Sequence, residues 1–329
     1  MSDYTSSVKV IIVGGGPAGI MAGLTCKRGI PISREQSWDV LILEKAHLGS
    51  FASWGNLRIT YRWHLPGLQL VRALAREVMQ TGILAKENSL VLKVVDKGEA
   101  IEVFTERGEC FHTDYLVVAT GFFPYGYLGN IPRVRVMFSS PELEGRLLAS
   151  LPPQEIFIYG RNNTTLNKKQ ILERLLPKSK FFLSTELETG NQIKQVIPEG
   201  KEGLTVVFSN LEKTYCNLLL IDYDSFTDDT GITDFLANLP VKRKRGYIPV
   251  DEWGRTTHPR VFAAGNITTP VSGALTALNS GFITGLGVFR AIYYDTYNCL
   301  PNLFPWLPSY GSHPLLSLKR YASGSLSST

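Results

Sequence analysis

The chain has few cysteines, little excess of either charge and no long uninterrupted apolar run. Its 329 residues contain four scattered cysteines, and no two of them form a C-x-x-C pair: Cys26, Cys110, Cys216 and Cys299. They have no histidine partners at metal-ligand spacing, which argues against a structural zinc site and against a secreted disulfide framework. A reducing, cytoplasmic compartment is therefore expected.

Charge and hydropathy set further limits on the partners. Lys and Arg exceed Asp and Glu by 34 − 29 = 5, which is too mild an excess to indicate a nucleic-acid binder. No stretch approaches the roughly 20 continuous apolar residues of a membrane span. The apolar N-terminal run contains three consecutive glycines and a proline, which does not suit a signal peptide. We expect no nucleic acid and no membrane as partners, and the length favours two domains.

A nucleotide-binding motif lies close to the N-terminus. The β-branched run Val8–Val13 has the length of a buried parallel strand, and Gly14, Gly16 and Gly19 follow it with the spacing G-x-G-x-x-G. In such a motif the first glycine makes the tight turn and the second lets backbone amides approach a pyrophosphate. The third lets the helix pack on the strand, with the diphosphate at the helix N-terminus. Pro17 suits the first helical turn.

A second strand supports this interpretation. The segment Trp38–Lys45 ends in Glu44, which is placed to accept hydrogen bonds from a ribose hydroxyl. An insert at residues 28–37 explains why Glu44 lies further from the glycines than the usual separation of about 20 residues. The alternative is a glycine turn with a solvated glutamate.

Two further strands end in small residues and indicate a flavin. Asp114–Pro124 runs into Ala119, Thr120 and Gly121, and Arg260–Pro270 contains Ala264, Gly265 and Asn266. With these segments the chain resembles the flavoprotein disulfide reductases, and by size their low-molecular-weight thioredoxin reductase branch, from residue 8 to about residue 295. The resemblance implies an FAD domain split by an inserted nucleotide domain, and a homodimer.

The resemblance also implies which residues hold FAD. Asn266 stands where the family usually has an aspartate near the flavin, so the charge is missing there although hydrogen bonding is retained. Leu275–Gly285 resembles the family's last FAD-facing helix, whose N-terminal amides stabilise reduced flavin. The expected cofactor-binding residues are Gly14, Gly16, Pro17, Ala18, Gly19, Glu44, Lys45, Thr120, Gly121, Gly265, Asn266 and Ala274.

At the second nucleotide turn the glycines are missing. Ile156–Tyr159 aligns with the strand that leads into the family's NADPH motif, but Asn162 replaces the glycine that admits the pyrophosphate, and Thr165 replaces the small packing residue. The paired arginines that hold a 2′-phosphate are absent too, so direct NADPH use is not expected. An alternative is a second FAD held from another direction. Its candidate ligands are Gly160, Arg161, Asn162, Asn163 and Thr164, with Lys168 and Lys169 nearby.

The family's reactive C-x-x-C is absent as well. The segment that should carry it, Val136–Leu148, contains two serines instead. Cys299 and Cys26 remain as weak redox candidates, but a free cysteine is more often a small buried hydrophobe.

Two segments favour partners of different kinds. About thirty residues follow the expected helix end near Asn298, and they are too apolar for a free linker. In ferredoxin-linked relatives such an extension covers the flavin, and the resemblance gives this role to Tyr310 or His313. The alternative is that the extension covers a dimer surface.

The run Val241–Tyr247 carries four adjacent cations. It is expected to be a solvated crossing between domains or a surface that steers an acidic protein such as ferredoxin.

The sequence therefore predicts an α/β protein with two Rossmann-like nucleotide-binding domains. The FAD domain is expected at residues 1–124 and 246–298, a degenerate NAD(P)H-binding-like domain at 125–245, and a tail at 299–329. The expected function is an FAD-dependent oxidoreductase that does not use NADPH directly. It would pass electrons from a protein donor such as ferredoxin, or through a second flavin, to a disulfide, a thioredoxin-like protein or another acceptor. The alternatives are a non-enzymatic FAD-binding redox sensor or partner-binding flavoprotein, and an NAD(P)H-dependent flavin reductase with an atypical site.

Overall fold

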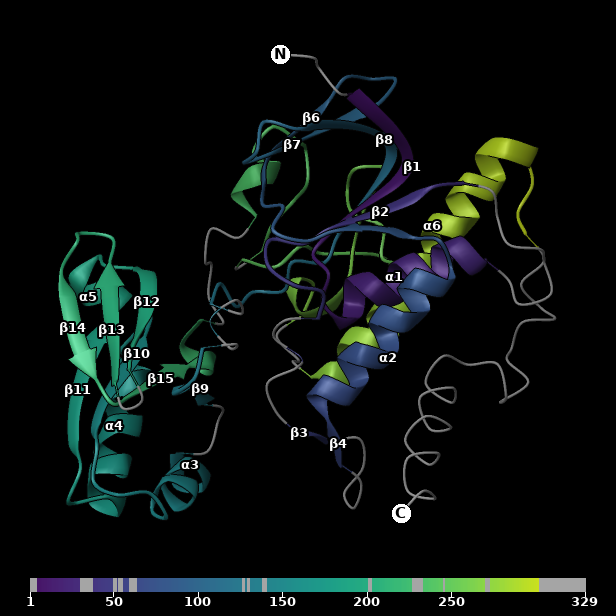
Figure 1. Cartoon of the computed structure of the whole chain (residues 1–329). Helices are drawn as coiled ribbons and strands as arrows, with labels where there is room; N and C mark the ends of the chain where they lie inside the picture. The colour runs from purple at the N-terminus through teal and green to yellow at the C-terminus, as the bar shows by residue number, and fades with distance from the viewer. Residues whose placement is uncertain are drawn as a thin grey trace. The chain divides into compact units, whose positions relative to one another are not determined.

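The chain divides into two compact units (Figure 1). The computed structural model describes residues 5–29, 38–49, 52, 56–58, 64–125, 128, 131–137, 141–200, 203–226, 233–244, 246–269 and 273–301. The first unit comprises Met1–Gly121 and Gly231–Thr329, and the second comprises Phe122–Thr230. This division places the return to the first unit near residue 231, whereas the sequence indicated residue 246. Val241 is buried in a core cluster of the first unit, so the run Val241–Tyr247 is not a crossing between the units.

The first unit is built on a seven-stranded sheet. In spatial order its strands are β5 (Leu84–Lys86), β2 (Val40–Leu43), β1 (Thr5–Val13), β8 (Cys110–Val118), β7 (Ile101–Thr105) and β6 (Val91–Asp96), and β16 (Val261–Ala263) also pairs with β8. The strands β1, β2, β5, β8 and β16 are parallel, while β6 and β7 form an antiparallel extension. A small separate hairpin joins β3 (Asn56–Arg58) to β4 (His64–Pro66).

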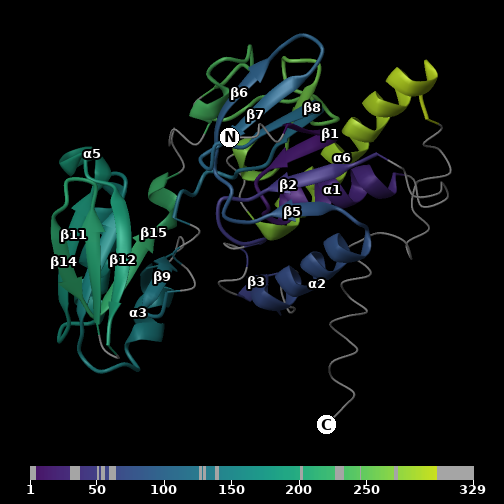
Figure 2. The ribbon, with the colours of Figure 1, turned by 45° about the horizontal axis from the view of Figure 1, so that its top comes forward.

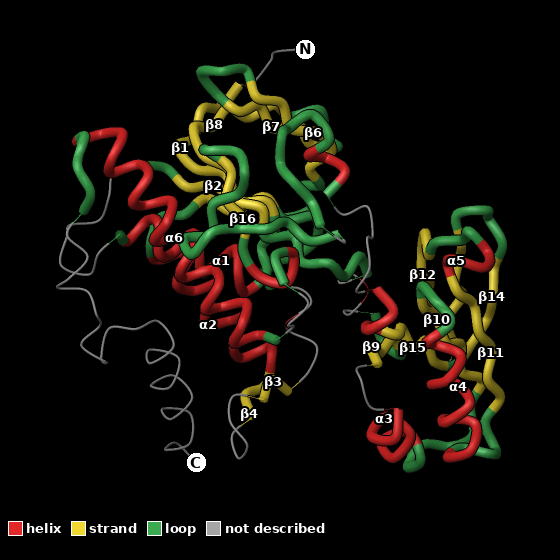
Figure 3. Tube along the Cα trace, turned by 180° about the vertical axis from the view of Figure 1, so that it is seen from behind, coloured by secondary structure: helices red, strands yellow, loops and turns green. Residues whose placement is uncertain are grey.

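Both faces of this sheet are covered. Helices α1 (Pro17–Arg28), α2 (Gly67–Gln80) and α6 (Ala274–Tyr297) lie together on one face (Figures 1 and 3). Val10 and Ile12 of β1 pack against these helices, whereas Ile11 and Val13 pack on the opposite side, with β6, β7 and the segment around Leu236. Burial on both faces explains why this strand is a continuous apolar run rather than an alternating one.

Helix α6 belongs to the core of the first unit. By length and composition it could cross a membrane, but half of its most apolar window is buried inside the protein. A Cβ on Gly281 would lie 2.2 Å from the carbonyl oxygen of Ala18, and one on Gly285 would lie 2.5 Å from that of Ala22. The two glycines therefore let α6 pack directly on the backbone of α1, and α6 ends at Tyr297, as expected from the sequence.

The second unit has its own parallel sheet (Figure 2). In spatial order its strands are β11 (Lys180–Thr185), β10 (Glu155–Gly160), β15 (Leu218–Asp222) and β9 (Val134–Met137). Helices α3 (Pro141–Leu148) and α4 (Thr164–Leu175) contribute Leu148 and Leu172 to a core beneath Ile156 and Ile158. The short helix α5 (Glu186–Thr189) follows β11, and the antiparallel strands β12 (Ile193–Glu199), β13 (Gly203–Phe208) and β14 (Lys213–Cys216) form a separate sheet. Phe157 of β10 faces that sheet, because its ring lies 5.8 Å from the ring of Phe208.

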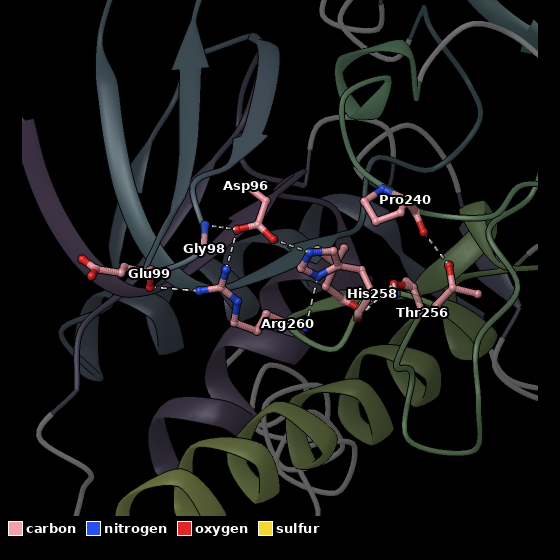
Figure 4. A network of polar contacts seen from close by, with 9 residues as sticks. Asp96, Gly98, Glu99, Pro240, Thr256, His258 and Arg260 are labelled. Atoms are coloured by element: carbon pink, nitrogen blue, oxygen red, sulfur yellow. Dashed lines mark hydrogen bonds and ion pairs between the residues drawn. The ribbon is translucent and has the colours of Figure 1, made fainter.

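A polar clamp joins β6 to the chain that leads into β16 (Figure 4). The Asp96 carboxylate accepts hydrogen bonds from His258 Nε2 at 2.9 Å, Arg260 Nη2 at 2.6 Å and Gly98 N at 2.8 Å. His258 Nδ1 accepts from the Arg260 amide, which leaves the ring proton on Nε2. Burial raises the pKa of Asp96, but the hydrogen bonds from Gly98 and His258 and the charge of Arg260 outweigh it, so the pKa lies below its usual value.

We expect Asp96→Asn to lower the free energy of unfolding by about 1.5–3 kcal/mol at pH 7, because hydrogen bonds to a charged acceptor are lost. The folded-state pKa of Asp96 is depressed, so the contribution is present above the unfolded value of about 3.9 and disappears as the pH falls through the folded value. Urea unfolding at pH 7 and at pH 3 measures both effects. The control is Asp234→Asn, which removes an exposed carboxylate 3.7 Å from Arg243 and should cost less than about 1 kcal/mol. Equal losses in the two variants would contradict this role.

Candidate cofactor site

The parallel strands bring the predicted cofactor residues to one edge of the first sheet. Val13, the last residue of β1, lies opposite Leu43 of β2 and Val118 of β8, and Val118 lies opposite Ala263 of β16. The turns after these four strands carry Gly14, Glu44, Thr120 with Gly121, and Gly265 with Asn266. Carboxyl ends of parallel strands are where open α/β sheets bind ligands.

The first glycine turn combines close packing with an open position. Gly14 has φ +107°, and a Cβ there would lie 2.4 Å from the carbonyl oxygen of Ala119. A Cβ on Gly19 would lie 1.9 Å from the carbonyl oxygen of Gly14, so both glycines are required for α1 to begin where it does. A Cβ on Gly16 would meet nothing within 4 Å. The space at Gly16, next to the N-terminus of α1 with Pro17 and Ala18 in its first turn, suits a pyrophosphate.

Glu44 is a buried carboxylate directly beside this turn. Its Oε2 accepts a hydrogen bond from Gly15 N at 2.6 Å and its Oε1 accepts one from Ala46 N at 2.9 Å. Glu44 is therefore fixed to the glycine turn by the backbone, and Lys45 beside it is exposed. A carboxylate can accept about four hydrogen bonds, so acceptor positions remain for ribose hydroxyls.

The far side of the site is anchored to α6. Gly265 begins the 3-10 turn η5 (Gly265–Ile267), and its amide donates to Ser280 Oγ at 2.9 Å. Asn266, in the same turn, is thereby held next to the first turns of α6, which begins at Ala274. Gly121 has φ +66° and open space around it. The open cradle, the helix N-terminus and the buried carboxylate together fit the ADP half of FAD.

The corresponding turn of the second unit is closed by its own side chains. Asn162 Oδ1 accepts from the amide of Thr164 at 3.0 Å and from its hydroxyl at 2.6 Å. Asn162 Nδ2 donates to the carbonyl oxygen of Ser225, and the amide of Arg161 donates to Ser225 Oγ. Donors that a pyrophosphate would use at Arg161 and Thr164 are therefore engaged within the unit, while Asn163 is exposed.

The lysines near this turn are also engaged. Lys168 Nζ contacts Asp222 Oδ1 at 2.6 Å and Asp224 Oδ2 at 2.8 Å, and the Thr165 hydroxyl donates to Asp222 Oδ2. Lys169 pairs with Glu173 at 2.7 Å. Both lysines expected near a phosphate are thus engaged within the unit, and the fully buried Asp222 at the end of β15 needs the charge of Lys168. Burial lowers the pKa of Lys168, but its bonds to Asp222 and Asp224 outweigh this and raise it.

Aromatic side chains fill the carboxyl ends of β10 and β15. Tyr125 and Tyr159 have ring centroids 5.5 Å apart, and both hydroxyls donate to Glu186 Oε1. The buried members of this edge aromatic cluster are Phe122, Phe123, Tyr125, Tyr159, Tyr223 and Phe226. Sequence reasoning missed it, although one signal was there: Glu186 follows β11 as Glu44 follows β2. In the second unit the Glu186 carboxylate accepts hydrogen bonds from two tyrosine hydroxyls, whereas Glu44 in the first unit accepts one from the glycine turn.

The cysteines show no redox pair, since all four are free thiols. Cys26 is only 1% exposed, and burial raises the pKa of its thiol to about 12 despite the opposing hydrogen bond from Trp38 and the charge of Lys27. Burial likewise raises the pKa of Cys216 to about 12. The buried thiol of Cys26 is thus a poor nucleophile, which disfavours a redox role. Cys299, the other redox candidate, is exposed. Tyr310 and His313, expected over the flavin, lie outside the described residues.

Comparison with known proteins supports the architecture. The family described as pyridine nucleotide-disulphide oxidoreductase matches residues 166–281. Thioredoxin reductase from Streptococcus pyogenes has 18% sequence identity and a TM-score of 0.54, with 88% of this chain and 99% of that chain covered. The Lactococcus lactis enzyme has 18% identity and a TM-score of 0.53, with 87% and 99% covered. HlmI has 16% identity and a TM-score of 0.54, with 99% and 100% covered.

At these identities the solved structures bear on the fold alone, and none of the curated proteins matches the sequence. The predicted fold, with two Rossmann-like units, is confirmed over most of the chain.

Because the space at Gly16 is open, we predict that a larger side chain there weakens cofactor binding without unfolding the chain. Gly16→Leu should leave the chain folded, with a loss of about 1 kcal/mol or less at this helix-capping position. Its side chain would occupy the cradle and weaken flavin binding by about tenfold or more. Flavin absorbance per purified chain and thermal unfolding measure the two effects. Gly19→Ala is the contrasting variant, because its methyl group meets a backbone oxygen and should destabilise the first unit itself.

Lys168 pairs with a buried carboxylate and Lys169 does not, so we predict that replacing them lowers the stability of the second unit by very different amounts. Lys168→Met should destabilise the second unit by about 3–5 kcal/mol, because Asp222 is left buried and unpaired. Lys169→Met should cost about 0.5 kcal/mol or less, as expected of an i,i+4 pair at the surface whose side chains are only partly buried. The folded-state pKa of Lys168 is raised, so its contribution is present below the unfolded value of about 10.4 and lost as the pH rises through the folded value. Denaturant unfolding is followed by fluorescence in a Phe182→Trp background, because a tryptophan there reports on the second unit. Similar losses of stability in both variants would contradict the pairing of Lys168 with the buried Asp222.

Proposed function

We propose that this chain, a divergent member of the pyridine nucleotide-disulphide oxidoreductase family, is an FAD-dependent oxidoreductase that receives electrons from a ferredoxin-type protein and not from NADPH. The contrast between its two glycine turns carries the proposal. In the first unit the turn is open at Gly16. In the second unit Asn162 and Thr165 close the equivalent turn with their own hydrogen bonds.

The first unit supplies what one FAD needs. Gly16 and the N-terminal amides of α1 would hold the pyrophosphate, and Glu44 would accept hydrogen bonds from the ribose. Ser280, in the second turn of α6, accepts a hydrogen bond from the amide of Gly265, and the N-terminal amides of α6 would stabilise a reduced flavin bound beside Asn266. Bound FAD accepts two electrons, so it can couple a one-electron donor protein to a two-electron acceptor such as a disulfide.

The second unit does not support a second dinucleotide. Its turn donors are engaged, Lys168 is paired with two aspartates, and the edge aromatic cluster occupies the strand ends. We therefore favour a single FAD per chain over the diflavin alternative. The closed turn after β10 favours a donor other than a nicotinamide dinucleotide, and we propose a protein that docks on the first unit.

The acceptor must also reach the flavin without an internal relay. The chain has no C-x-x-C, and Cys26 and Cys216 are buried with raised pKa values. A disulfide of a thioredoxin-like protein, or another oxidant, would take two electrons and two protons directly from the cofactor site. A homodimer in the cytoplasm remains part of this proposal.

Flavin content and anaerobic reduction of the purified protein provide the test. We expect one flavin per chain by absorbance against peptide mass, no bleaching of the flavin band by NADPH or NADH within minutes, and bleaching by two equivalents of reduced ferredoxin. Bleaching by NADPH within seconds would show that the turn closed by Asn162 and Thr165 does not exclude the dinucleotide, and it would favour an atypical NAD(P)H reductase. A second flavin per chain would restore the diflavin alternative. A flavin that neither donor reduces would favour the redox sensor.

A further inference from the structure

Ser280 lies inside helix α6, but its side chain binds a different element. A serine or threonine within a helix often donates to a carbonyl oxygen one turn earlier. Thr296 of the same helix does so, since its hydroxyl donates to the carbonyl oxygen of Ile292 at 2.8 Å. Among the described residues the Ser280 hydroxyl has no such acceptor, and its oxygen accepts the amide of Gly265 at 2.9 Å. The side chain of Ser280 therefore ties α6 to the η5 turn.

The η5 turn stands against the part of the site that would hold the pyrophosphate. Gly265 has φ +77°, and a Cβ there would lie 2.7 Å from the Cβ of Ala18, in the first turn of α1. The carbonyl oxygen of Gly265 accepts from the amide of Thr268 at 3.0 Å and from its hydroxyl at 2.8 Å. The peptide groups of Gly265 are thus bonded on both sides, and Ser280 supplies the bond on the amide side.

A second hydroxyl of α6 makes a comparable bond to a different place. Thr284 lies one turn further along the helix, is 1% exposed, and donates to the carbonyl oxygen of Ala263 at 3.1 Å. Ala263 is the last residue of β16, so this bond holds the strand and not the turn. The two hydroxyls therefore divide their roles, with Thr284 fixing β16 and Ser280 fixing η5.

We propose that Ser280 is a positioning residue for the flavin half of the cofactor, an inference that rests on the proposed function in requiring bound FAD. Without its oxygen the buried amide of Gly265 loses its acceptor. A glycine changes its backbone conformation with little steric penalty, so the turn that presents Asn266 would rearrange. The ADP half would bind at Gly16 and Glu44, which do not depend on this bond.

The test compares three variants of the full-length chain with the parent protein. Ser280→Ala removes the acceptor, Ser280→Thr keeps a hydroxyl at the same position, and Thr284→Val removes the neighbouring bond to β16. Titration of each apoprotein gives the Kd of FAD and, separately, that of ADP. Hydrogen–deuterium exchange of the peptide that contains Gly265 reports whether its amide is still bonded, and thermal unfolding reports the stability of the chain.

We expect Ser280→Ala to raise the Kd of FAD about tenfold, as the loss of one hydrogen bond to a buried amide would do. The same variant should leave the Kd of ADP within about twofold and should speed exchange of the Gly265 amide. Ser280→Thr should restore FAD binding. Thr284→Val should lower the Tm but leave both Kd values within about twofold, because its bond does not hold the turn.

A Ser280→Ala variant that binds FAD as tightly as the parent overturns the positioning role. Equal losses of FAD and ADP affinity overturn it too, as does an equal loss of FAD affinity in Thr284→Val, because a general weakening of the first unit then explains the effect. A parent protein that binds FAD but is not reduced by ferredoxin overturns the proposed electron donor and leaves the role of Ser280 standing. A parent protein that binds no FAD overturns both.

Discussion

Four backbone segments meet at the N-terminus of α1, namely the turn after β1, the residues after β8, α1 itself and α6, and the architecture of the first unit depends on these contacts. A Cβ on Gly14 would meet Ala119, one on Gly19 would meet Gly14, and one on Gly281 would meet Ala18, each within 2.4 Å of a carbonyl oxygen. Side chains larger than hydrogen would push α1 away from β1 and α6 away from α1. The approach brings the strand ends, the helix N-terminus and the η5 turn to one place. At this edge of the sheet Gly16 and Gly121 lie beside open space.

The two units share a strand, turn and helix order but satisfy the donors at the helix N-terminus differently. The first amides of any helix lack partners within the helix. In the first unit Glu44 takes the amide of Gly15 and leaves the cradle at Gly16 open. In the second unit Asn162 takes the amide of Thr164, and Lys168 neutralises the buried Asp222. The second arrangement is stable without a ligand, because its polar groups already have partners.

In the second unit the turn after β10 is closed by its own side chains, and the sequence has no C-x-x-C. The remaining thiols with raised pKa values, Cys26 and Cys216, are suited to packing and not to exchange.

The sequence by itself determined four parallel strands of the first unit, β1, β2, β8 and β16, its glycine turn and the position of Glu44. Each of these features depends on residues close in the chain: a continuous apolar run marks a strand buried on both faces, and glycine spacing marks a turn that needs close approach. Only the tertiary structure showed that the second turn is closed by its own side chains and that the basic run belongs to the first unit. Lys168 lies 54 residues from Asp222, and Tyr125 lies 61 residues from Glu186. Such pairings depend on strand order and register, so residues that look like free ligands in the sequence prove to be partners of one another. The basic run shows the same limit, because only the contacts of Val241, Thr257 and Ile248 assign it to the first unit and turn an apparent linker into an anchored surface.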